Sequence, residues 1–279
     1  MLQNLRYIRQ ELGEHYSQSE RSTLARIILE EVSGLTFADI TSGKSSNLSV
    51  SQSRKMKQII ARLKNGEPFQ YVLGKTTFYG LDFVVGREVL IPRPETEELV
   101  EWIIDDNGAK PITILDIGTG SGCIAIALAA NILNASVHGW DISSAALKMA
   151  EENAHRNKVQ LFFTQQNLFD PVPAAPQFDL IVSNPPYITE SERETMDSTV
   201  TDHEPEEALF VPDSDPLLFY KRIASLAEGL LNEGGRLFFE IHRCRGAEVC
   251  TMLQEKCFRE IELRRDLSGN DRMVRAVKK

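Results

Sequence analysis

From residue 111 onward the chain alternates short apolar runs with longer segments of helical periodicity, and this alternation constrains the fold more than any other feature. The runs at residues 112–117 and 178–182 are rich in isoleucine, leucine and valine, which is typical of buried strands. Residues 144–156 and 217–231 instead repeat apolar side chains at helical spacing. Strands that alternate with helices predict a doubly wound α/β sheet with a mostly parallel core.

The same alternation predicts the other elements of this region. Two further β segments flank Ser268-Gly269-Asn270-Asp271 and predict a C-terminal hairpin that adds an antiparallel strand. We expect strands at residues 112–117, 136–140, 161–164, 178–182 and 236–241, and helices at residues 122–130, 144–156, 217–231 and 246–256.

Residues 1–66 predict a separate small helical domain. Apolar residues recur at helical spacing in residues 2–12 and again in residues 24–32, with Ser19 as a candidate cap of the second helix. A loop rich in serine and glycine leads to a third helix at residues 51–63, which Asn65-Gly66 ends.

Residues 67–95 differ in character from both flanking regions. Apolar side chains are interspersed with Gly74, Gly80 and Gly86, which predicts a β-hairpin linker. A helix then begins at Glu95 or Thr96. We therefore expect a helical substrate-recognition domain at residues 1–66, the linker at residues 67–95 and a catalytic α/β domain at residues 96–279.

Composition and charge exclude several classes of protein. The net charge of −9 is uneven, because residues 1–75 carry 11 basic and 7 acidic side chains and the remainder carries 20 and 33. A catalytic region with a net charge of −13 is a poor binder of duplex DNA. The mildly basic N-terminal region contacts an acidic partner or RNA, or is simply a solvated helical surface.

Neither a membrane anchor nor a metal site is expected. No apolar run reaches the roughly 20 residues that a transmembrane helix needs, and the first residues lack the pattern of a signal peptide. The four cysteines form no C-x-x-C pair and have no histidines at zinc-ligand spacing. We expect a cytoplasmic protein with reduced thiols.

A glycine-rich loop follows the first expected strand of the α/β region. Gly118, Thr119, Gly120, Ser121 and Gly122 lie between that strand and a helix, where glycines allow the backbone to approach a ligand closely. This pattern suits a nicotinamide site or a methyltransferase site. The dinucleotide fingerprint is met only loosely, because its third small position is Cys123.

Two polar residues after the next strands are candidates for binding a nucleoside. Asp141 ends the second strand, where a carboxylate can accept hydrogen bonds from both ribose hydroxyls; it is otherwise the N-cap of the following helix. Asn167 follows the third strand and carries both an acceptor and a donor for an adenine edge; it is otherwise a plain loop residue.

The tetrapeptide Asn184-Pro185-Pro186-Tyr187 follows the fourth strand and carries the catalytic chemistry. The oxygen of the Asn184 side chain and the backbone carbonyl of Pro185 can each accept one N–H of a planar NH₂ group. The prolines hold that backbone rigid, and Tyr187 can pack against a flat substrate. Such a site needs no strong base, because the nitrogen becomes acidic as it is alkylated. An Asn-Pro tight turn is the alternative.

Taken together, these motifs resemble the protein-(glutamine-N5) methyltransferases of peptide chain release factors. The resemblance covers nearly the whole chain, and the linker segment Ile91-Pro92-Arg93-Pro94-Glu95-Thr96 is the part that separates this family from nucleic-acid methyltransferases. It also includes Phe69–Gly74, Phe78-Tyr79-Gly80, Asp116–Gly122, Asp141-Ile142-Ser143, Ser183–Tyr187 and Glu204-Pro205.

The resemblance implies a fold, a cofactor and a substrate. The fold is a seven-stranded Rossmann-like methyltransferase domain preceded by a small helical domain and a β-hairpin. The cofactor is S-adenosyl-L-methionine, held by Gly118 to Gly122 and Asp141. The substrate is the glutamine of a Gly-Gly-Gln loop in release factors. Asn184 would contact cofactor and substrate, and Pro185 to Tyr187 would contact the glutamine.

Two segments depart from the family pattern, and a third has two possible roles. Asn167-Leu168 stands where an acidic residue and a large apolar residue are usual. His242 lies in a segment that usually carries a glycine and a glutamine, and a strand-end position is favoured over a role as base. Glu204-Pro205 either orders a substrate-facing loop or lies in solvent.

Rival functions come from several classes. A DNA adenine-N6 or RNA guanine-N2 methyltransferase would share the tetrapeptide but needs base flipping and a basic groove. A non-catalytic adaptor with a nucleoside pocket has no need of Asn184 to Tyr187. A nicotinamide oxidoreductase would bind NADH. We expect release factors as protein partners and no direct binding of nucleic acid.

Overall fold

The computed structural model describes residues 1–42, 47–108, 110–172 and 177–279. The chain divides into two compact units. Residues 1–74 and 198–203 form the first, and residues 75–197 and 204–279 form the second.

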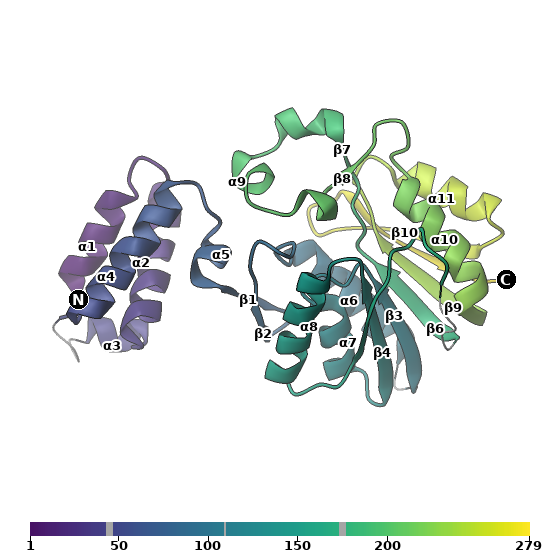
Figure 1. Ribbon diagram of the computed structural model, residues 1–279, viewed down its shortest axis with the longest axis horizontal. Coiled ribbons are helices and arrows are strands. Elements are labelled where there is room, and N and C mark those ends of the chain that lie inside the picture. Colours follow the sequence, from purple (N-terminus) through teal and green to yellow (C-terminus); the bar gives the residue numbers. More distant parts are fainter. Residues whose placement is uncertain (43–46, 109, 173–176) are drawn as a thin grey trace. The chain divides into compact units, whose positions relative to one another are not determined.

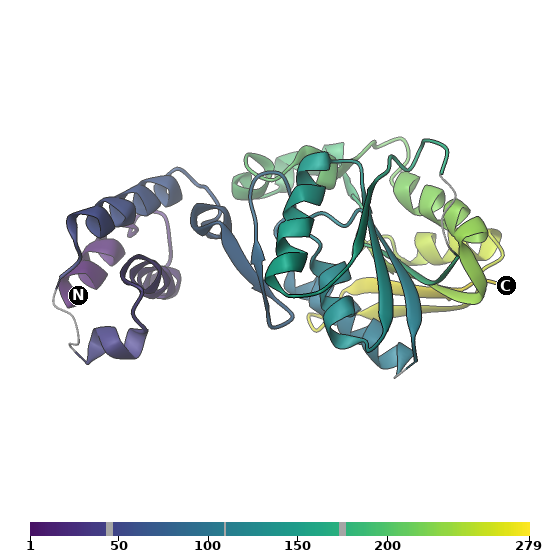
Figure 2. The same cartoon turned by 60° about the horizontal axis from the view of Figure 1, so that its bottom comes forward.

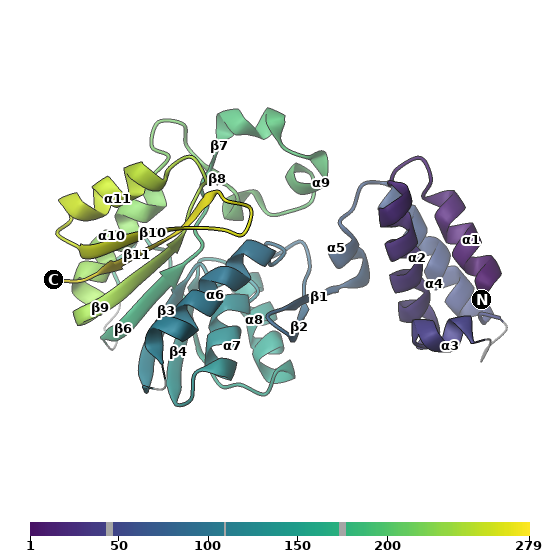
Figure 3. The same cartoon turned by 180° about the vertical axis from the view of Figure 1, so that it is seen from behind.

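The first unit is a small helical bundle. Helices α1, α2 and α4 lie side by side (Figure 3). Their apolar faces meet around Ile8, Leu12, Ile28, Leu29 and Leu63, each at most 1% exposed. The helices of the N-terminal segment are α1 (Leu2–Glu11), α2 (Gln18–Ser33), α3 (Phe37–Thr41), α4 (Val50–Lys64) and α5 (Phe69–Leu73), and α9 (Ser198–Thr201) joins the unit from later in the chain.

In the first unit, two helices start slightly before the expected positions. The N-cap of α2 is Ser17 rather than Ser19, because Ser17 and Glu20 form a reciprocal capping box. Helix α4 starts in the same way from Ser49 and Gln52. Its C-cap is Asn65, as expected.

The segment after α4 contains one helix and one hairpin. The five-residue helix α5 follows Pro68 and was not expected from the sequence, because its length gives no periodic pattern. The expected hairpin consists of β1 (Lys75–Phe78) and β2 (Leu81–Val84), which pair antiparallel. Phe78 and Phe83 pack edge to face across it, with ring centroids 6.1 Å apart.

Seven strands of the described residues form the mixed sheet of the second unit, in the order β10-β11-β9-β6-β3-β4-β5. Strands β9, β6, β3, β4 and β5 are parallel, and β11 pairs antiparallel with both β9 and β10. The strands are β3 (Ile112–Ile117), β4 (Ala135–Asp141), β5 (Phe162–Gln165), β6 (Phe178–Ser183), β9 (Leu231–Glu240), β10 (Arg259–Arg265) and β11 (Asp271–Val277).

This arrangement confirms the expected parallel core with a C-terminal antiparallel hairpin, which forms one edge of the sheet (yellow in Figure 2). Strand β9 begins at Leu231, five positions before the expected Arg236. Leu231 pairs with Phe178, and a register shift before the pair Leu180–Arg236 accommodates the intervening residues.

Helices cover both faces of the sheet (Figure 1). Side chains of β3 alternate between the two layers, with Ile114 in the first core cluster and Leu115 in the second. Helices α6 (Pro94–Asn107), α7 (Cys123–Asn131) and α8 (Ser144–Arg156) pack on the first face, and α10 (Leu218–Leu230) and α11 (Gly246–Glu255) pack on the second. Two short strands, β7 (Ile188–Thr189) and β8 (Phe210–Val211), pair beyond the main sheet.

The strand order creates a crevice at one point. The chain passes from β3 to β4 and β5 on one side, and β6 then returns to the other side of β3. Loops after β3 and β6 therefore diverge at the carboxyl ends of adjacent strands, where open α/β sheets bind ligands. None of the helices in the described ranges is long and apolar enough to cross a membrane.

Candidate active site

A cavity of about 630 Å³ lies in the second unit, in the crevice between β3 and β6. Its volume is in the range of sites for small molecules and cofactors. The sequence-predicted residues that line it are Gly118, Thr119, Gly120, Ser121, Asp141, Asn167, Asn184, Pro185 and Pro186. Gly122 and Tyr187 are next to lining residues in the sequence but do not line the cavity themselves.

The glycine loop is held open by backbone conformations that favour glycine. Gly118 and Gly120 have φ angles of +73° and +54°. Gly122 has a packing role: at φ +81°, a Cβ there would lie 3.1 Å from the Cβ of Ala150 in α8 and 2.9 Å from Ile126. The loop is further fixed by buried Asp116, which accepts a hydrogen bond of 2.7 Å from Thr119.

Asp141 joins the ends of β3 and β4. One carboxylate oxygen accepts from the backbone N–H of Gly120 at 2.8 Å, and the other accepts from Ser143 at 2.9 Å. Burial raises the pKa of Asp141 above its ordinary value, and these backbone hydrogen bonds oppose that shift. The N-cap of α8 is Ser143, so Asp141 is not the cap of this helix. Each oxygen of Asp141 retains a lone pair for a ligand in the cavity.

Asn167 forms a local turn beside the cavity. Its Oδ1 accepts from the backbone N–H of Phe169 at 3.0 Å, and the NH₂ group and the second lone pair of Oδ1 are left for a ligand. Around it lie apolar residues that the sequence reading missed: Ile142 and Phe169 are 52% and 51% exposed, and Phe169 packs against Phe219. The signal available in the sequence was their position, within two residues of the predicted polar residues Asp141 and Asn167.

These residues fit a nucleoside. Asp141 offers carboxylate oxygens beside the open glycine loop, and Ile142 and Phe169 provide apolar surface for a flat base. The cavity also has the size that such a ligand needs. No group of three or more histidine, cysteine or acidic side chains suited to a metal ion occurs among the described residues.

The tetrapeptide begins at the end of β6. Ser183 donates to the backbone carbonyl of Ile117 at 2.7 Å and ties the end of β6 to the end of β3. The Nδ2 of Asn184 donates to Thr96 Oγ1 at 3.3 Å, and Pro185 is buried in the cavity wall. The hydroxyl of Tyr187 donates to Glu240 Oε1 at 3.4 Å. Burial, the largest cause, raises the pKa of Tyr187, so the phenol stays protonated.

Two residues behind the tetrapeptide were missed as site residues. Thr96 was expected as a helix start at the end of the linker segment, but α6 begins earlier, at Pro94. Thr96 lines the cavity, and its hydroxyl donates to Glu240 at 2.6 Å. Glu240 ends β9 and is 1% exposed. The two residues come from distant parts of the sequence, so no motif spacing connects them.

Residues of the linker segment, Ile91 to Thr96, contact Glu204-Pro205 in one wall of the cavity. Arg93 Nη2 contacts Glu204 Oε1 at 2.5 Å, and the backbone N–H of Ile91 donates to Glu204 Oε2 at 3.2 Å. The Glu204 side chain is only 1% exposed, so the solvent-exposed alternative for this residue is wrong. Arg93 and Pro205 both line the cavity.

We expect Arg93→Ala to lower the free energy of unfolding by about 3 kcal/mol, because it leaves a buried carboxylate without its cation. Urea denaturation measures this change. The matched control is Lys221→Ala, which removes an exposed ion pair with Asp215 and should cost less than about 1 kcal/mol. Equal midpoints for the two variants would contradict the proposed role of the buried pair.

His242 lies just beyond the end of β9 and is outside the cavity lining. Its Nδ1 accepts from the backbone N–H of Cys244 at 3.2 Å, which leaves the ring proton on Nε2, 3.1 Å from Glu192. Burial lowers the pKa of His242, so the ring is neutral at pH 7. Its contacts are those of a strand-end histidine.

The fold and the cavity together define a class. A parallel sheet with an antiparallel C-terminal hairpin, a glycine loop after β3 and an acidic residue at the end of β4 form a Rossmann-like methyltransferase domain. The family model "Methyltransferase small domain" matches residues 96–202, and the model "PrmC N-terminal domain" matches residues 3–74. A methyltransferase from Pyrococcus furiosus has the same fold, with a TM-score of 0.53, 15% identity, and coverage of 81% of this chain and 98% of that one.

Two relatives match nearly the whole chain. The release factor glutamine methyltransferase of Bacteroides thetaiotaomicron is 44% identical over 272 residues, with 97% of both chains covered. That of Flavobacterium psychrophilum is 43% identical, with 95% of both covered. The chain therefore belongs to the family of release factor glutamine methyltransferases, and S-adenosylmethionine is its methyl donor.

Proposed function

We propose that this protein methylates the side-chain amide nitrogen of the glutamine in the Gly-Gly-Gln loop of peptide chain release factors, and so acts in translation termination. The observation that carries the proposal is the position of Asn184 and Pro185. Both line the cavity at the carboxyl end of β6, beside the glycine loop that follows β3. The similarity to release factor glutamine methyltransferases supports the substrate.

The cofactor would be held by the loop after β3 and the residues after β4 and β5. Asp141 would accept hydrogen bonds from the ribose hydroxyls, and the open conformation of Gly118 to Ser121 would let the ligand approach the backbone closely. Ile142 and Phe169 would pack against adenine, and Asn167 would donate to its edge. S-adenosylmethionine supplies a methyl group that its sulfonium charge already activates.

The substrate nitrogen would be held by two acceptors. An amide nitrogen is a poor nucleophile because its lone pair is delocalised. Asn184 Oδ1 and the carbonyl of Pro185 would each accept one N–H, which fixes the nitrogen toward the methyl donor and stabilises the positive charge that develops there. Pro185 and Pro186 hold the backbone, and Tyr187 supports the turn from outside the cavity. The proton leaves as the nitrogen becomes acidic, so no side chain has to act as a strong base.

Recognition of the whole release factor would involve the N-terminal domain, residues 1–66. The hairpin region at residues 67–95 would link it to the catalytic domain at residues 96–279. The exposed side chains of Arg54 and Lys57 line a groove on α4, in a region where basic residues exceed acidic ones. An acidic surface of the release factor would suit this groove.

We expect the double variant Arg54→Glu and Lys57→Glu to raise KM for the full-length release factor about tenfold, with kcat and the Kd for S-adenosylmethionine unchanged. Steady-state kinetics over a range of release factor concentrations measures this. Lys148→Glu changes an exposed charge on α8 and is the control. An unchanged KM would show that the groove on α4 does not bind the release factor.

The main rival is a methyltransferase acting on adenine or guanine in nucleic acid. The strongly acidic charge of the catalytic region argues against it, so we propose no direct binding of nucleic acid and a cytoplasmic location with the release factors. Labelled S-adenosylmethionine can be offered in parallel to release factor, duplex DNA and single-stranded RNA. We expect label only on the protein; label on a nucleic acid alone would replace the proposal with the rival.

A further inference from the structure

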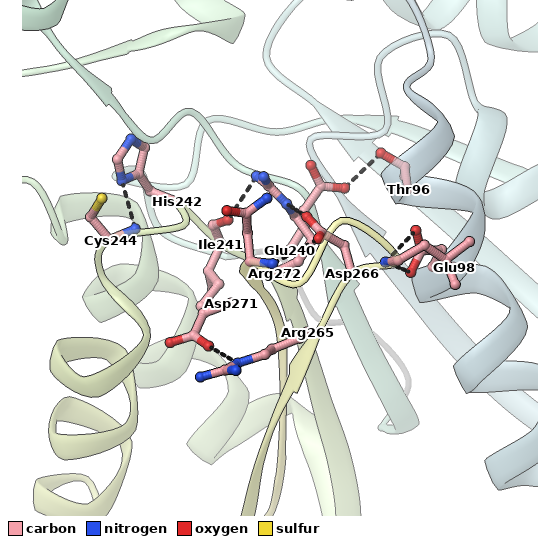
Figure 4. Close-up of polar contacts among 12 residues, drawn as sticks. Thr96, Glu98, Glu240, Ile241, His242, Cys244, Arg265, Asp266, Asp271 and Arg272 are labelled. Carbon is pink, nitrogen blue, oxygen red and sulfur yellow. Dashed lines mark hydrogen bonds and ion pairs between the residues drawn. The ribbon is translucent and has the colours of Figure 1, made fainter.

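Asn184 is one end of a hydrogen-bonded chain that leads to a buried carboxylate. Its Nδ2 donates to Thr96 Oγ1 at 3.3 Å, and Thr96 Oγ1 donates to Glu240 Oε2 at 2.6 Å. Figure 4 shows the Thr96 hydroxyl of α6 directed at the Glu240 carboxylate at the end of β9. Thr96 and Glu240 are 2% and 1% exposed, so water does not compete for these contacts.

This chain of hydrogen bonds has a direction. A threonine hydroxyl has one hydrogen, and here Thr96 gives it to Glu240, so its oxygen can only accept from Asn184. The Asn184 amide must therefore turn its NH₂ group toward Thr96. Were the amide flipped, two oxygens with no hydrogen between them would face each other. The oxygen Oδ1 of Asn184 has no donor among the described residues and is free to accept from a ligand.

Glu240 also holds the other end of the tetrapeptide. Its second oxygen accepts from the Tyr187 hydroxyl at 3.4 Å, and its backbone carbonyl accepts from Tyr220 at 3.3 Å. Arg272 lies beside the carboxylate (Figure 4), where it donates to the Ile241 carbonyl and to Asp266. A single buried carboxylate thus links α6, β9 and the loop after β6.

We propose that Thr96 and Glu240 are positioning residues that fix the orientation of the Asn184 amide, so that its oxygen and not its NH₂ group meets the substrate nitrogen. This inference rests on the proposed function. The wrong orientation would present donors to the donor hydrogens of the substrate amide, and methyl transfer would lose one of its two acceptors. Neither residue needs to touch the substrate for this role.

The orientation depends on the charge of Glu240. Burial, the largest cause, raises the pKa of Glu240 above its ordinary value; Glu95 on α6 raises it further, and Thr96, Arg272 on β11 and Tyr187 oppose the shift. As the pH falls through this raised pKa, the carboxyl gains a proton and can donate to Thr96. The Thr96 hydroxyl can then turn its own hydrogen toward Asn184 and stabilise the flipped amide.

The first test compares Thr96→Val with Thr96→Ser. Valine keeps the shape and removes the hydroxyl, and we expect kcat on release factor to fall about 10- to 100-fold, the effect of losing one orienting hydrogen bond. KM for the release factor and Kd for S-adenosylmethionine should stay within about threefold, and serine should restore most of kcat. Thr251→Val, at an exposed threonine of α11, is the control. An unchanged kcat in Thr96→Val overturns the inference.

The second test does not depend on how well the valine variant folds. The pH profile of kcat is measured for the wild type and for Glu240→Gln, whose side chain does not titrate. We expect an acid limb in the wild type that is absent in Glu240→Gln. A limb missing from the wild type, or present unchanged in the variant, contradicts the inference. Wild-type protein that transfers no methyl group to release factor at any pH would instead refute the proposed function.

Discussion

Asn184→Ala should lower kcat for methyl transfer to release factor by about 10³-fold, the upper range for removing one group that stabilises charge in a transition state. The variant loses the side-chain acceptor for the substrate N–H and leaves only the Pro185 carbonyl. Asn184 also lines the cavity proposed to hold the cofactor, so Kd for S-adenosylmethionine should rise, by less than about tenfold. Single-turnover kinetics with saturating cofactor separates the two effects.

The control for this variant is Asn131→Ala. Asn131 lies at the C-terminal end of α7, where its side chain donates to the Ala127 carbonyl and is exposed. Its replacement should leave the single-turnover rate unchanged. A rate for Asn184→Ala within tenfold of the wild type would show that the tetrapeptide asparagine is not the acceptor.

Asp141→Ala should raise the Kd for S-adenosylmethionine by about 100-fold. The variant removes the carboxylate proposed to bind the ribose, and hydrogen bonds to a charged group contribute about 1.5–3 kcal/mol each. In the wild type, the backbone N–H of Gly120 donates to Asp141 at 2.8 Å. The variant loses this hydrogen bond, so its glycine loop becomes less well ordered. Isothermal titration calorimetry with the cofactor measures the change.

Asp170→Ala tests whether the effect of Asp141 is specific. Asp170 is an exposed carboxylate close to Asn167 in sequence and outside the cavity lining. Its removal makes the same change of net charge, and cofactor affinity should be retained. Similar Kd values for the two variants would mean that Asp141 does not bind the ribose and that its contacts are purely structural.

The sheet could be predicted from sequence because its signals are local. Runs such as residues 112–117 and the periodic segment 144–156 each carry their own pattern, and the structure has β3 and α8 at those positions. Elements without such a pattern were missed. Helix α5 has five residues, and strands β7 and β8 have two each. The start of β9 depended on a register shift against β6, which only the neighbouring strand reveals.

The same distinction applies to the site. Gly118, Asp141 and Asn184 each lie at the end of a strand or directly after one. Parallel strands bring their carboxyl ends together, so spacing along the sequence was enough to place the three residues in one cavity. The supporting contacts join residues far apart in sequence. Thr96 and Glu240 are separated by 144 positions, and Arg93 and Glu204 by 111. No local pattern marks these pairs, and only the folded chain shows that they touch.

The measurement that tests the central claim most directly is methyl transfer from labelled S-adenosylmethionine to purified release factor. A second release factor, with the glutamine of its Gly-Gly-Gln loop changed to alanine, is run beside it. We expect label on the intact factor and none on the altered one. Equal labelling of both would place the methyl group elsewhere on the protein, and no labelling of either by enzyme that still binds the cofactor would contradict release factor as the substrate.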